Sequence, residues 1–347
     1  MNTKVWVVDN IVEKKGDYPQ LQEAASLLQS GEVVAFPTET VYGLGADATS
    51  DEAVEKIFLA KGRPSDNPLI VHIATTEQLN TIVDEIPAKA EMLIQRFWPG
   101  PLTLVLPKKE GISHRVTAGL STVAVRMPDH PIALALIKQA NVPVAAPSAN
   151  RSGRPSPTLA AHVYEDLNKK VAGIVDGGAT GVGVESTVLD CTSAVPVILR
   201  PGGVTKEQLE AVIGEVDVDA ALKDETQTPK SPGMKYTHYA PNAPLTIVEG
   251  TREFLQQLVN QKKEQGLKTG ILTTEENASF YVGDVIVACG RREALTTVAA
   301  KLYDALRAFD TAQVDVIFSE SFPQEGIGIA IMNRLQKASG HCVIFEN

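Results

Sequence analysis

The chain has 347 residues, of which 44% are hydrophobic and 21% charged, and its formal net charge is −10. This length predicts about two domains, and the ordinary composition excludes a disordered, collagenous or low-complexity chain. A protein that mainly grips nucleic acid usually carries a basic face, so the acidic balance argues against that class. The N-terminal residues lack a signal-peptide pattern, and no run reaches about 18 apolar residues, which predicts a soluble, cytoplasmic protein.

The cysteines and histidines show no metal-binding pattern. Cys191, Cys289 and Cys342 are far apart, and no pair has the C-x-x-C spacing. They predict buried, reduced thiols rather than a disulfide framework or a zinc ribbon. The histidines are equally scattered, so we expect no protein-bound metal.

In the first half of the chain, apolar runs alternate with amphipathic segments, which predicts an α/β domain. We expect a helix over residues 20–30 with Gly31 at its C-cap, and a strand over 32–37. Thr49 to Glu52 form a predicted capping box for a helix that ends at Gly62. Further strands are expected at 69–73, 102–106, 123–127, 144–146, 173–176, 186–191 and 197–200. Further helices are expected at 88–97, 131–140, 159–167 and 206–213.

The last strands of this half follow one another without a helix between them. We therefore expect a twisted mixed sheet flanked by helices rather than a purely parallel sheet. Residues 215–242 combine charges and prolines without a sustained period, which predicts an interdomain linker.

The C-terminal part alternates strands and helices in a regular rhythm. Strands are expected at 245–248, 268–272, 285–288 and 314–318, and helices at 251–265, 292–309 and 327–339. This rhythm predicts a smaller, Rossmann-like parallel α/β domain. The predicted domains are therefore residues 1–214 and 243–347, joined by the linker at 215–242.

Gly43 to Ala48 match a loose G-x-G-x-x-A pattern. A dinucleotide fingerprint also needs an acid about 20 residues on, after a second strand, where this chain has a predicted loop. A tight glycine turn is therefore the favoured interpretation, and the chain contains no P-loop motif.

Lys61 and Arg63 place two cations in a loop between a helix and a strand. Gly62 and Pro64 restrict the backbone there, so both side chains can face one anionic ligand. The alternative is that both cations only complement the dipole at the C-terminus of the helix. The loop alone does not decide between them.

Arg126 lies on an apolar strand, on the same face as Thr122 and Ala124 and opposite Val123 and Val125. A charge in such a strand needs a partner or a ligand. Ligand binding and a structural salt bridge are both open. His72, also on a strand, is by itself more typical of a satisfied core histidine.

Polar residues also follow several predicted strands. They occur at Ser148-Ala149-Asn150, Glu185-Ser186-Thr187 and Leu199-Arg200. Strand ends are where α/β sheets usually bind ligands, although the first segment also suits a turn-rich loop.

Taken together, five separated segments resemble the threonylcarbamoyl-AMP synthase family and its YrdC-like domain. They are Phe36-Pro37-Thr38-Glu39-Thr40-Val41-Tyr42-Gly43-Leu44, Lys61-Gly62-Arg63-Pro64, Ser148-Ala149-Asn150, Glu185-Ser186-Thr187 and Leu199-Arg200-Pro201-Gly202. They fall in the family's order and spacing. Residues 231–241 resemble the linker of the long, two-domain branch, so the resemblance covers nearly the whole chain.

The resemblance implies a reaction in which L-threonine and bicarbonate (or CO2) give an N-carboxylated threonine. Its carboxylate attacks the α-phosphate of ATP, which releases pyrophosphate and forms L-threonylcarbamoyl-AMP. Downstream tRNA threonylcarbamoyltransferase proteins then use this product to modify the adenosine next to the anticodon. Stable tRNA binding and membrane binding by this chain are not expected.

The resemblance also implies the residues of two compartments. Threonine is expected near Thr38, His72, Arg126, Ala146 and Ser186. ATP is expected near Lys61, Ser65, Thr122, Ser148, Ser156 and Arg200, with Mg2+ carried on its phosphates. Supporting or shared residues are Arg63, Asn67, Asn150, Tyr236 and His238, the last two in a linker that is expected to close as a lid.

No residue stands out as a general base, so proximity and charge stabilisation are expected to dominate catalysis. Two alternatives remain: an RNA-binding protein that acts directly on tRNA or ribosomes, and a carbamoyltransferase of the hydrogenase-maturation type. The second needs zinc-finger modules that three scattered cysteines do not supply. The role of the C-terminal domain is open.

Overall fold

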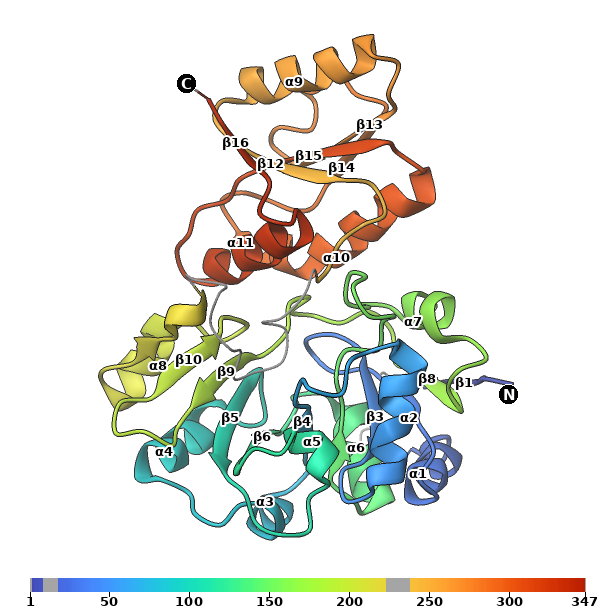
Figure 1. Ribbon diagram of the computed structural model, residues 1–347, viewed down its shortest axis with the longest axis vertical. Coiled ribbons are helices and arrows are strands. Elements are labelled where there is room, and N and C mark those ends of the chain that lie inside the picture. The colour runs from blue at the N-terminus through green and yellow to red at the C-terminus, as the bar shows by residue number, and fades with distance from the viewer. Residues whose placement is uncertain (1, 9–17, 223–237, 347) are drawn as a thin grey trace. The chain divides into compact units, whose positions relative to one another are not determined.

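The computed structural model describes residues 2–8, 18–222 and 238–346, which form two compact bodies (Figure 1). In these ranges the first body comprises residues up to 152 together with 157–181 and 185–222. The second comprises 153–156, 182–184 and the residues from 238 onward. Two short segments that precede residue 185 thus pack with the C-terminal part of the chain.

The first body contains one mixed sheet, as predicted. In spatial order its described strands are β1 (Lys4–Val7), β8 (Gly173–Asp176), β2 (Val34–Phe36), β3 (Gly43–Asp47), β7 (Val144–Ala145), β4 (Ile70–His72), β6 (Thr122–Arg126), β5 (Leu102–Pro107), β9 (Thr187–Asp190), β10 (Val197–Arg200) and β11 (Asp217–Val218). Strands β4 and β6 pair parallel, whereas β5 and β6 pair antiparallel.

Eight α-helices accompany this sheet in the described ranges. They are α1 (Leu21–Gln29), α2 (Asp51–Lys61), α3 (Thr76–Ile82), α4 (Ala88–Phe97), α5 (His114–Thr117), α6 (Pro131–Ala140), α7 (Ala160–Leu167) and α8 (Lys206–Ile213). A short 3-10 turn, η1 (Ala220–Leu222), follows β11. Strands β1 and β11 and helices α3 and α5 were not predicted, because each is too short to show a period.

Helix α2 begins one residue later than its sequence predicts. Ser50 is the N-cap residue, and its hydroxyl accepts a hydrogen bond from the amide of Ala53 at 3.1 Å. The amide and hydroxyl of Thr49 both donate to the carboxylate of Asp47 instead. The helix ends as predicted at Gly62, which adopts the left-handed conformation with φ of 63°.

The two faces of the sheet carry different side chains. On one face, Val123 and Val125 of β6 join the large core that α2, α4 and α8 complete. On the other face, α1 and α6 pack against β2 and β7. Farther along that second face lies a small apolar group, which comprises Ile70, Val105, Ala124, Val188 and Leu199. Arg126 lies on this second face, as the strand pattern predicted.

The expectation of a tight glycine turn at Gly43 to Ala48 was wrong, because Gly43–Asp47 form strand β3 between β2 and β7. Gly45 explains the glycine pattern. A Cβ at this position would lie 2.7 Å from both the Phe36 ring and a Val144 methyl group. Because Gly45 has no side chain, it leaves room over the middle of β3 for large side chains of the neighbouring strands.

The second body contains a parallel sheet, as predicted. Its strands are, in spatial order, β14 (Val285–Ala288), β13 (Thr269–Thr273), β15 (Val316–Glu320), β12 (Leu245–Glu249) and β16 (Val343–Phe345). Figure 1 shows α9 (Arg252–Glu264) on one face, and α10 (Leu295–Ala312) and α11 (Ile327–Ala338) on the other. Strand β16 was missed in the sequence because its apolar run is only a few residues long.

The cysteine prediction was correct in part. Cys191 and Cys289 are buried and unoxidised, but Cys342 is exposed in the turn before β16. In the described part of the chain, no helix has the length and apolar character needed to cross a membrane.

The close approach at Gly45 predicts that Gly45→Ala destabilises the first body. The added methyl group meets a ring and a branched side chain in a packed interior, which costs about 1–3 kcal/mol. Urea denaturation followed by tryptophan fluorescence measures this body alone, because the chain's two tryptophans, Trp6 and Trp98, both lie in it. Gly181→Ala is the matched control, since its nearest atom would lie 4.0 Å away. Equal urea midpoints for the two variants would contradict this account.

Candidate functional site

A row of polar side chains crosses neighbouring strands at one end of the first sheet. His72, the last residue of β4, pairs in register with Arg126, the last residue of β6. Leu104 of β5 pairs with Val125, which places Thr103 beside Arg126. The hydroxyl of Thr103 lies 2.8 Å from that of Ser186, immediately before β9. These residues are distant in the sequence but lie side by side at one end of the strands, which we call the polar edge of the first sheet.

Arg126 is the centre of this row and is 3% exposed. Its Nε donates to the carbonyl of Gly100 at 3.2 Å, and its Nη1 donates to the hydroxyl of Thr40 at 3.0 Å. Its Nη2 forms an ion pair with Glu39 at 2.5 Å. A guanidinium has five N–H donors, so these contacts leave one donor on each terminal nitrogen for a ligand. The structural salt bridge therefore exists and does not exclude ligand binding.

Thr38 organises the loop that carries these partners. Its hydroxyl donates to the carbonyl of Val41 at 2.6 Å and accepts from the amides of Thr40 and Val41. Because that donation uses its one hydrogen, the hydroxyl of Thr40, 2.9 Å away, donates to Thr38. A directed chain of hydrogen bonds thus runs from Arg126 through Thr40 to Thr38.

Arg200 and Ser186 are in direct contact. The Nε and Nη2 of Arg200 donate to the Ser186 carbonyl at 3.1 and 2.9 Å, and Nη2 also donates to the Ser186 hydroxyl at 3.1 Å. Gly202 lets the two segments approach, since a Cβ there would lie 2.3 Å from the Glu185 carbonyl. A residue expected in the threonine compartment thus touches one expected in the ATP compartment.

Lys61 anchors the loop that follows β7. Its ammonium donates to the carbonyls of Ser148 and Asn150 and to the Asn150 side-chain oxygen, the last two at 2.6 and 3.2 Å. The hydroxyl of Ser148 donates to the same side-chain oxygen at 2.6 Å. Lys61 is 2% exposed. Two predicted ATP-site residues, Lys61 and Ser148, and one predicted shared residue, Asn150, therefore form one cluster at the end of α2.

His72 belongs to the row and His130 lies near Glu39, and burial keeps both histidines neutral. Burial and the charge of Arg126 lower the pKa of His72 to about 3. His72 is a packed core histidine: its Nδ1 lies 3.2 Å from the carbonyl of Ile70, and its ring meets Phe36 edge-on. Burial also lowers the pKa of His130 to about 4, although the charge of Glu39 opposes this effect.

The other predicted residues lie apart from these contacts. Ser65 is exposed in the loop after α2, and Arg63 is half-buried there, with its Nη2 3.5 Å from the Pro68 carbonyl. Asn67 is buried, and its side-chain oxygen has no hydrogen-bond partner in the described ranges. Thr122 lies at the opposite end of β6 from Arg126, about 13 Å along the strand.

Four further predicted residues are Ala146, Ser156, Tyr236 and His238. The amide of Ala146 donates to the carbonyl of Ile70 at 2.9 Å, which ties the end of β7 to β4. Ser156 is fully buried and belongs to the second body. Tyr236 lies outside the described residues. His238 is described, and its ring centroid lies 5.6 Å from that of Tyr239.

Four polar residues of this edge were missed as candidates: Glu39, Thr40, Thr103 and His130. Glu39 and Thr40 belong to the motif that contains Thr38, but their partner Arg126 is more than 80 residues away, and no local pattern shows that pairing. Thr103 could have been found, because it is the polar residue of an apolar strand and shares a face with Val105.

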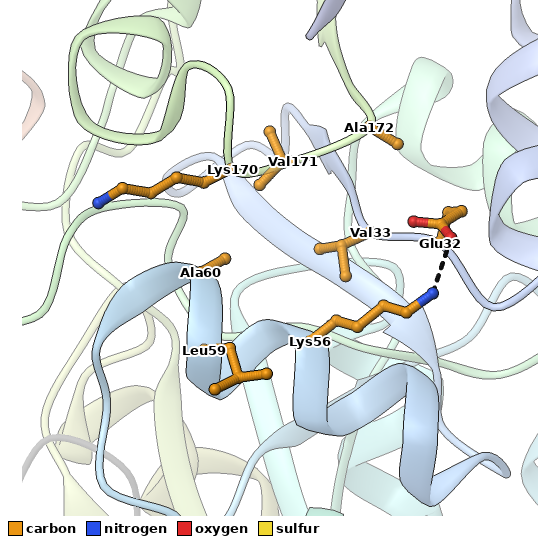
Figure 2. A pocket seen from close by; sticks show the side chains of 8 residues that line it. All are labelled: Glu32, Val33, Lys56, Leu59, Ala60, Lys170, Val171 and Ala172. Carbon is orange, nitrogen blue, oxygen red and sulfur yellow. Dashed lines mark hydrogen bonds and ion pairs between the residues drawn. The ribbon is translucent and has the colours of Figure 1, made fainter. Parts of the chain in front are cut away.

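A hollow of about 440 Å³ lies elsewhere on the first body, beside the last turns of α2. Figure 2 shows its apolar lining, with Lys56 reaching Glu32 at 2.7 Å and Lys170 pointing away from that pair. None of the predicted site residues lines it. In the described part of the chain, no group of three or more histidine, cysteine or acidic side chains is arranged to hold a metal ion.

The fold of the two bodies and the polar edge of the first sheet together identify a two-domain α/β protein with a YrdC-like domain. A family model described as "Telomere recombination" matches residues 26–202, and the model "Threonylcarbamoyl-AMP synthase, C-terminal domain" matches residues 204–340. The chain belongs to the threonylcarbamoyl-AMP synthase family, in its two-domain form.

Individual relatives agree with this assignment. A threonylcarbamoyl-AMP synthase of Bacillus subtilis is 61% identical over 99% of this chain and 100% of its own length. The crystal structure of Pyrococcus abyssi Sua5 complexed with L-threonine is 49% identical, covers 99% of this chain and 100% of that one, and superposes with a TM-score of 0.93. A shorter synthase of Photobacterium profundum is 36% identical over 52% of this chain and 98% of its own length.

The neutral histidines predict an acid-dependent loss of stability. The unfolded chain protonates His130 below about pH 6.5, whereas the folded chain does so only near pH 4. The stability that His130 contributes is therefore complete above about pH 6.5 and is lost as the pH falls toward 4. In His130→Gln, the unfolding free energy should fall less steeply over this range, by about 1.4 kcal/mol per pH unit.

Urea denaturation at several pH values, followed by tryptophan fluorescence, measures this slope. His114→Gln is the control, because water surrounds that exposed ring in the folded and unfolded chain alike. If the unfolding free energy of His130→Gln fell with pH as steeply as that of the wild type, the folded protein would hold His130 protonated.

Proposed function

We propose that this chain converts L-threonine, bicarbonate (or CO2) and ATP into L-threonylcarbamoyl-AMP and pyrophosphate. The threonine nitrogen is first carboxylated, and the new carboxylate then displaces pyrophosphate from the α-phosphate of ATP, which makes the chain a nucleotidyltransferase. The names of its full-length relatives and the threonine complex of the Pyrococcus abyssi protein support this proposal.

The observation that carries the proposal is the buried guanidinium of Arg126, with two donors left for an anion. A planar pair of N–H groups matches a carboxylate, so we assign the threonine carboxylate to Arg126. Thr38, His72, Ala146 and Ser186 complete the compartment. Neutral His72 adds no charge to the compartment.

ATP is assigned to the cluster of Lys61, Ser148 and Asn150, together with Arg200. Every reactant is anionic, so bringing them together is costly unless fixed cations compensate. Lys61 and Arg200 are held by protein carbonyl groups before any ligand arrives. Magnesium accompanies ATP as part of the substrate, because it keeps its waters and binds phosphates readily.

The contact between Ser186 and Arg200 refines the two-compartment picture. A carbamate formed on the threonine nitrogen must meet the α-phosphate of ATP, so the compartments have to adjoin somewhere. We place that junction at Ser186 and Arg200. The product then supplies the threonylcarbamoyl group for modification of tRNA, in the cytoplasm, through separate transferase proteins.

Pyrophosphate release should depend jointly on threonine, bicarbonate and MgATP. A coupled pyrophosphatase assay with each substrate omitted in turn measures this dependence. Release that continues without threonine would refute the proposal.

Arg126→Lys should lower kcat/KM for threonine about 10- to 100-fold, since lysine keeps the charge but loses the planar fork, a change of about 1.4–2.7 kcal/mol. The matched control is Arg115→Lys, because Arg115 forms an ion pair with Glu55 at the surface. An effect of equal size in both variants would show that Arg126 has no special role in threonine binding.

A further inference from the structure

Helix α10 of the second body holds a segment of the N-terminal half. Arg307 is 3% exposed, and its Nη2 donates to the carbonyl of Pro155 at 2.6 Å. One turn on, Asp310 forms an ion pair with Arg154 at 3.1 Å. Two buried charged side chains of α10 therefore bind adjacent residues of the segment 153–156. Charged groups buried in this way hold their partners in fixed positions.

The end of the predicted linker forms hydrogen bonds with the same segment and with Asp310. The amide of Ala240 donates to the carbonyl of Gly153 at 2.9 Å. The amide of Asn242 donates to the second oxygen of Asp310 at 2.7 Å. Asp310 therefore joins the segment, the linker and α10 through a single carboxylate.

A second segment, Val182–Val184, packs on the first half of α10. Gly183 has φ of 79°, and a Cβ there would lie 2.2 Å from the carbonyl oxygen of Ala299 and 2.4 Å from the Cα of Ala300. Only a residue without a side chain fits between this segment and the helix. The backbone of α10 therefore fixes the path of the second segment by direct contact.

Both segments continue directly into residues assigned to the substrates. The first segment follows Asn150, which belongs to the ATP cluster, by three residues. The amide of Ser152, one residue before it, donates to the carbonyl of Lys61 at 2.9 Å. The second segment ends one residue before Glu185-Ser186.

We propose that α10 is a positioning element for the reaction, in which Arg307 and Asp310 fix the segment that follows Asn150 of the ATP cluster and the backbone at Ala299 fixes the segment that leads into Ser186 for threonine. This inference rests on the proposed function and gives the C-terminal domain a role in it. Neither Arg307 nor Asp310 touches substrate; both act through the segments that they hold.

The ATP arm of the test uses Arg307→Ala in the full-length chain. KM for ATP should rise about tenfold, which corresponds to ~1.4 kcal/mol, while KM for threonine stays within about twofold. Arg307→Lys, which keeps a donor for Pro155, should restore most of the loss. The matched control is Lys301→Ala, because Lys301 lies on the same helix, is exposed and pairs with Glu275.

The threonine arm uses Gly183→Ala. The added methyl group meets the backbone of α10, so KM for threonine should rise about tenfold, and KM for ATP should rise less, through the contact between Ser186 and Arg200. Gly181→Ala, in the same loop but with open space around it, is the control. Melting temperatures of all variants show whether each remains folded at the assay temperature.

The two arms separate positioning from mere stability. A purely structural role for α10 would move both KM values equally, or neither, and either result would overturn the inference. Calorimetric titration with MgATP alone gives a readout that does not need turnover. If the wild type shows joint substrate dependence but Arg307→Ala binds MgATP normally, the proposed function stands and this inference fails. If the wild type binds no MgATP, both fail.

Discussion

The ion pair between Arg126 and Glu39 is the interaction on which the site depends most. Both side chains are nearly inaccessible to water, at 4% and 12% exposure, so removing either partner leaves an uncompensated buried charge and costs about 3–5 kcal/mol. The same guanidinium binds the carbonyl of Gly100 and, through Thr40, the Thr38 loop. One cation thus joins the end of β6, the turn before β5 and the loop after β2.

The charge distribution of the site follows from this arrangement. Its positive charges are those of arginine and lysine, because burial keeps His72 and His130 neutral. Arg126, Arg200 and Lys61 are each held by backbone carbonyl groups, so their donors are oriented before substrate arrives. Such preorganised charge stabilises developing negative charge with little rearrangement, which suits a reaction between anions that lacks an evident general base.

The sequence predicted the features that local patterns determine. Apolar runs located most strands, and alternation placed Arg126 on the face opposite Val123 and Val125. The glycines of β3 were interpreted as a turn because the reason for Gly45, room for Phe36 and Val144, depends on strand pairing, and Val144 is far away in the sequence. The ion pair between Arg126 and Glu39 was not predicted either, because these two residues are far apart in the sequence. The family resemblance identified the site motifs in the sequence. The contact between Ser186 and Arg200 is visible only in the fold.

The shorter Photobacterium profundum relative bears on what a second domain contributes. It matches 52% of this chain across 98% of its own length, so a synthase of that name extends little beyond the first domain. For the proposed function, this agrees with reacting groups in the first domain and a positioning role for the C-terminal domain. In this chain the segments 153–156 and 182–184 pack with the C-terminal part rather than with the sheet from which they emerge. Loops without support from their own sheet are mobile unless something else holds them. Here the buried charges and close backbone of α10 supply that support, so the second domain restrains the loops without entering the chemistry.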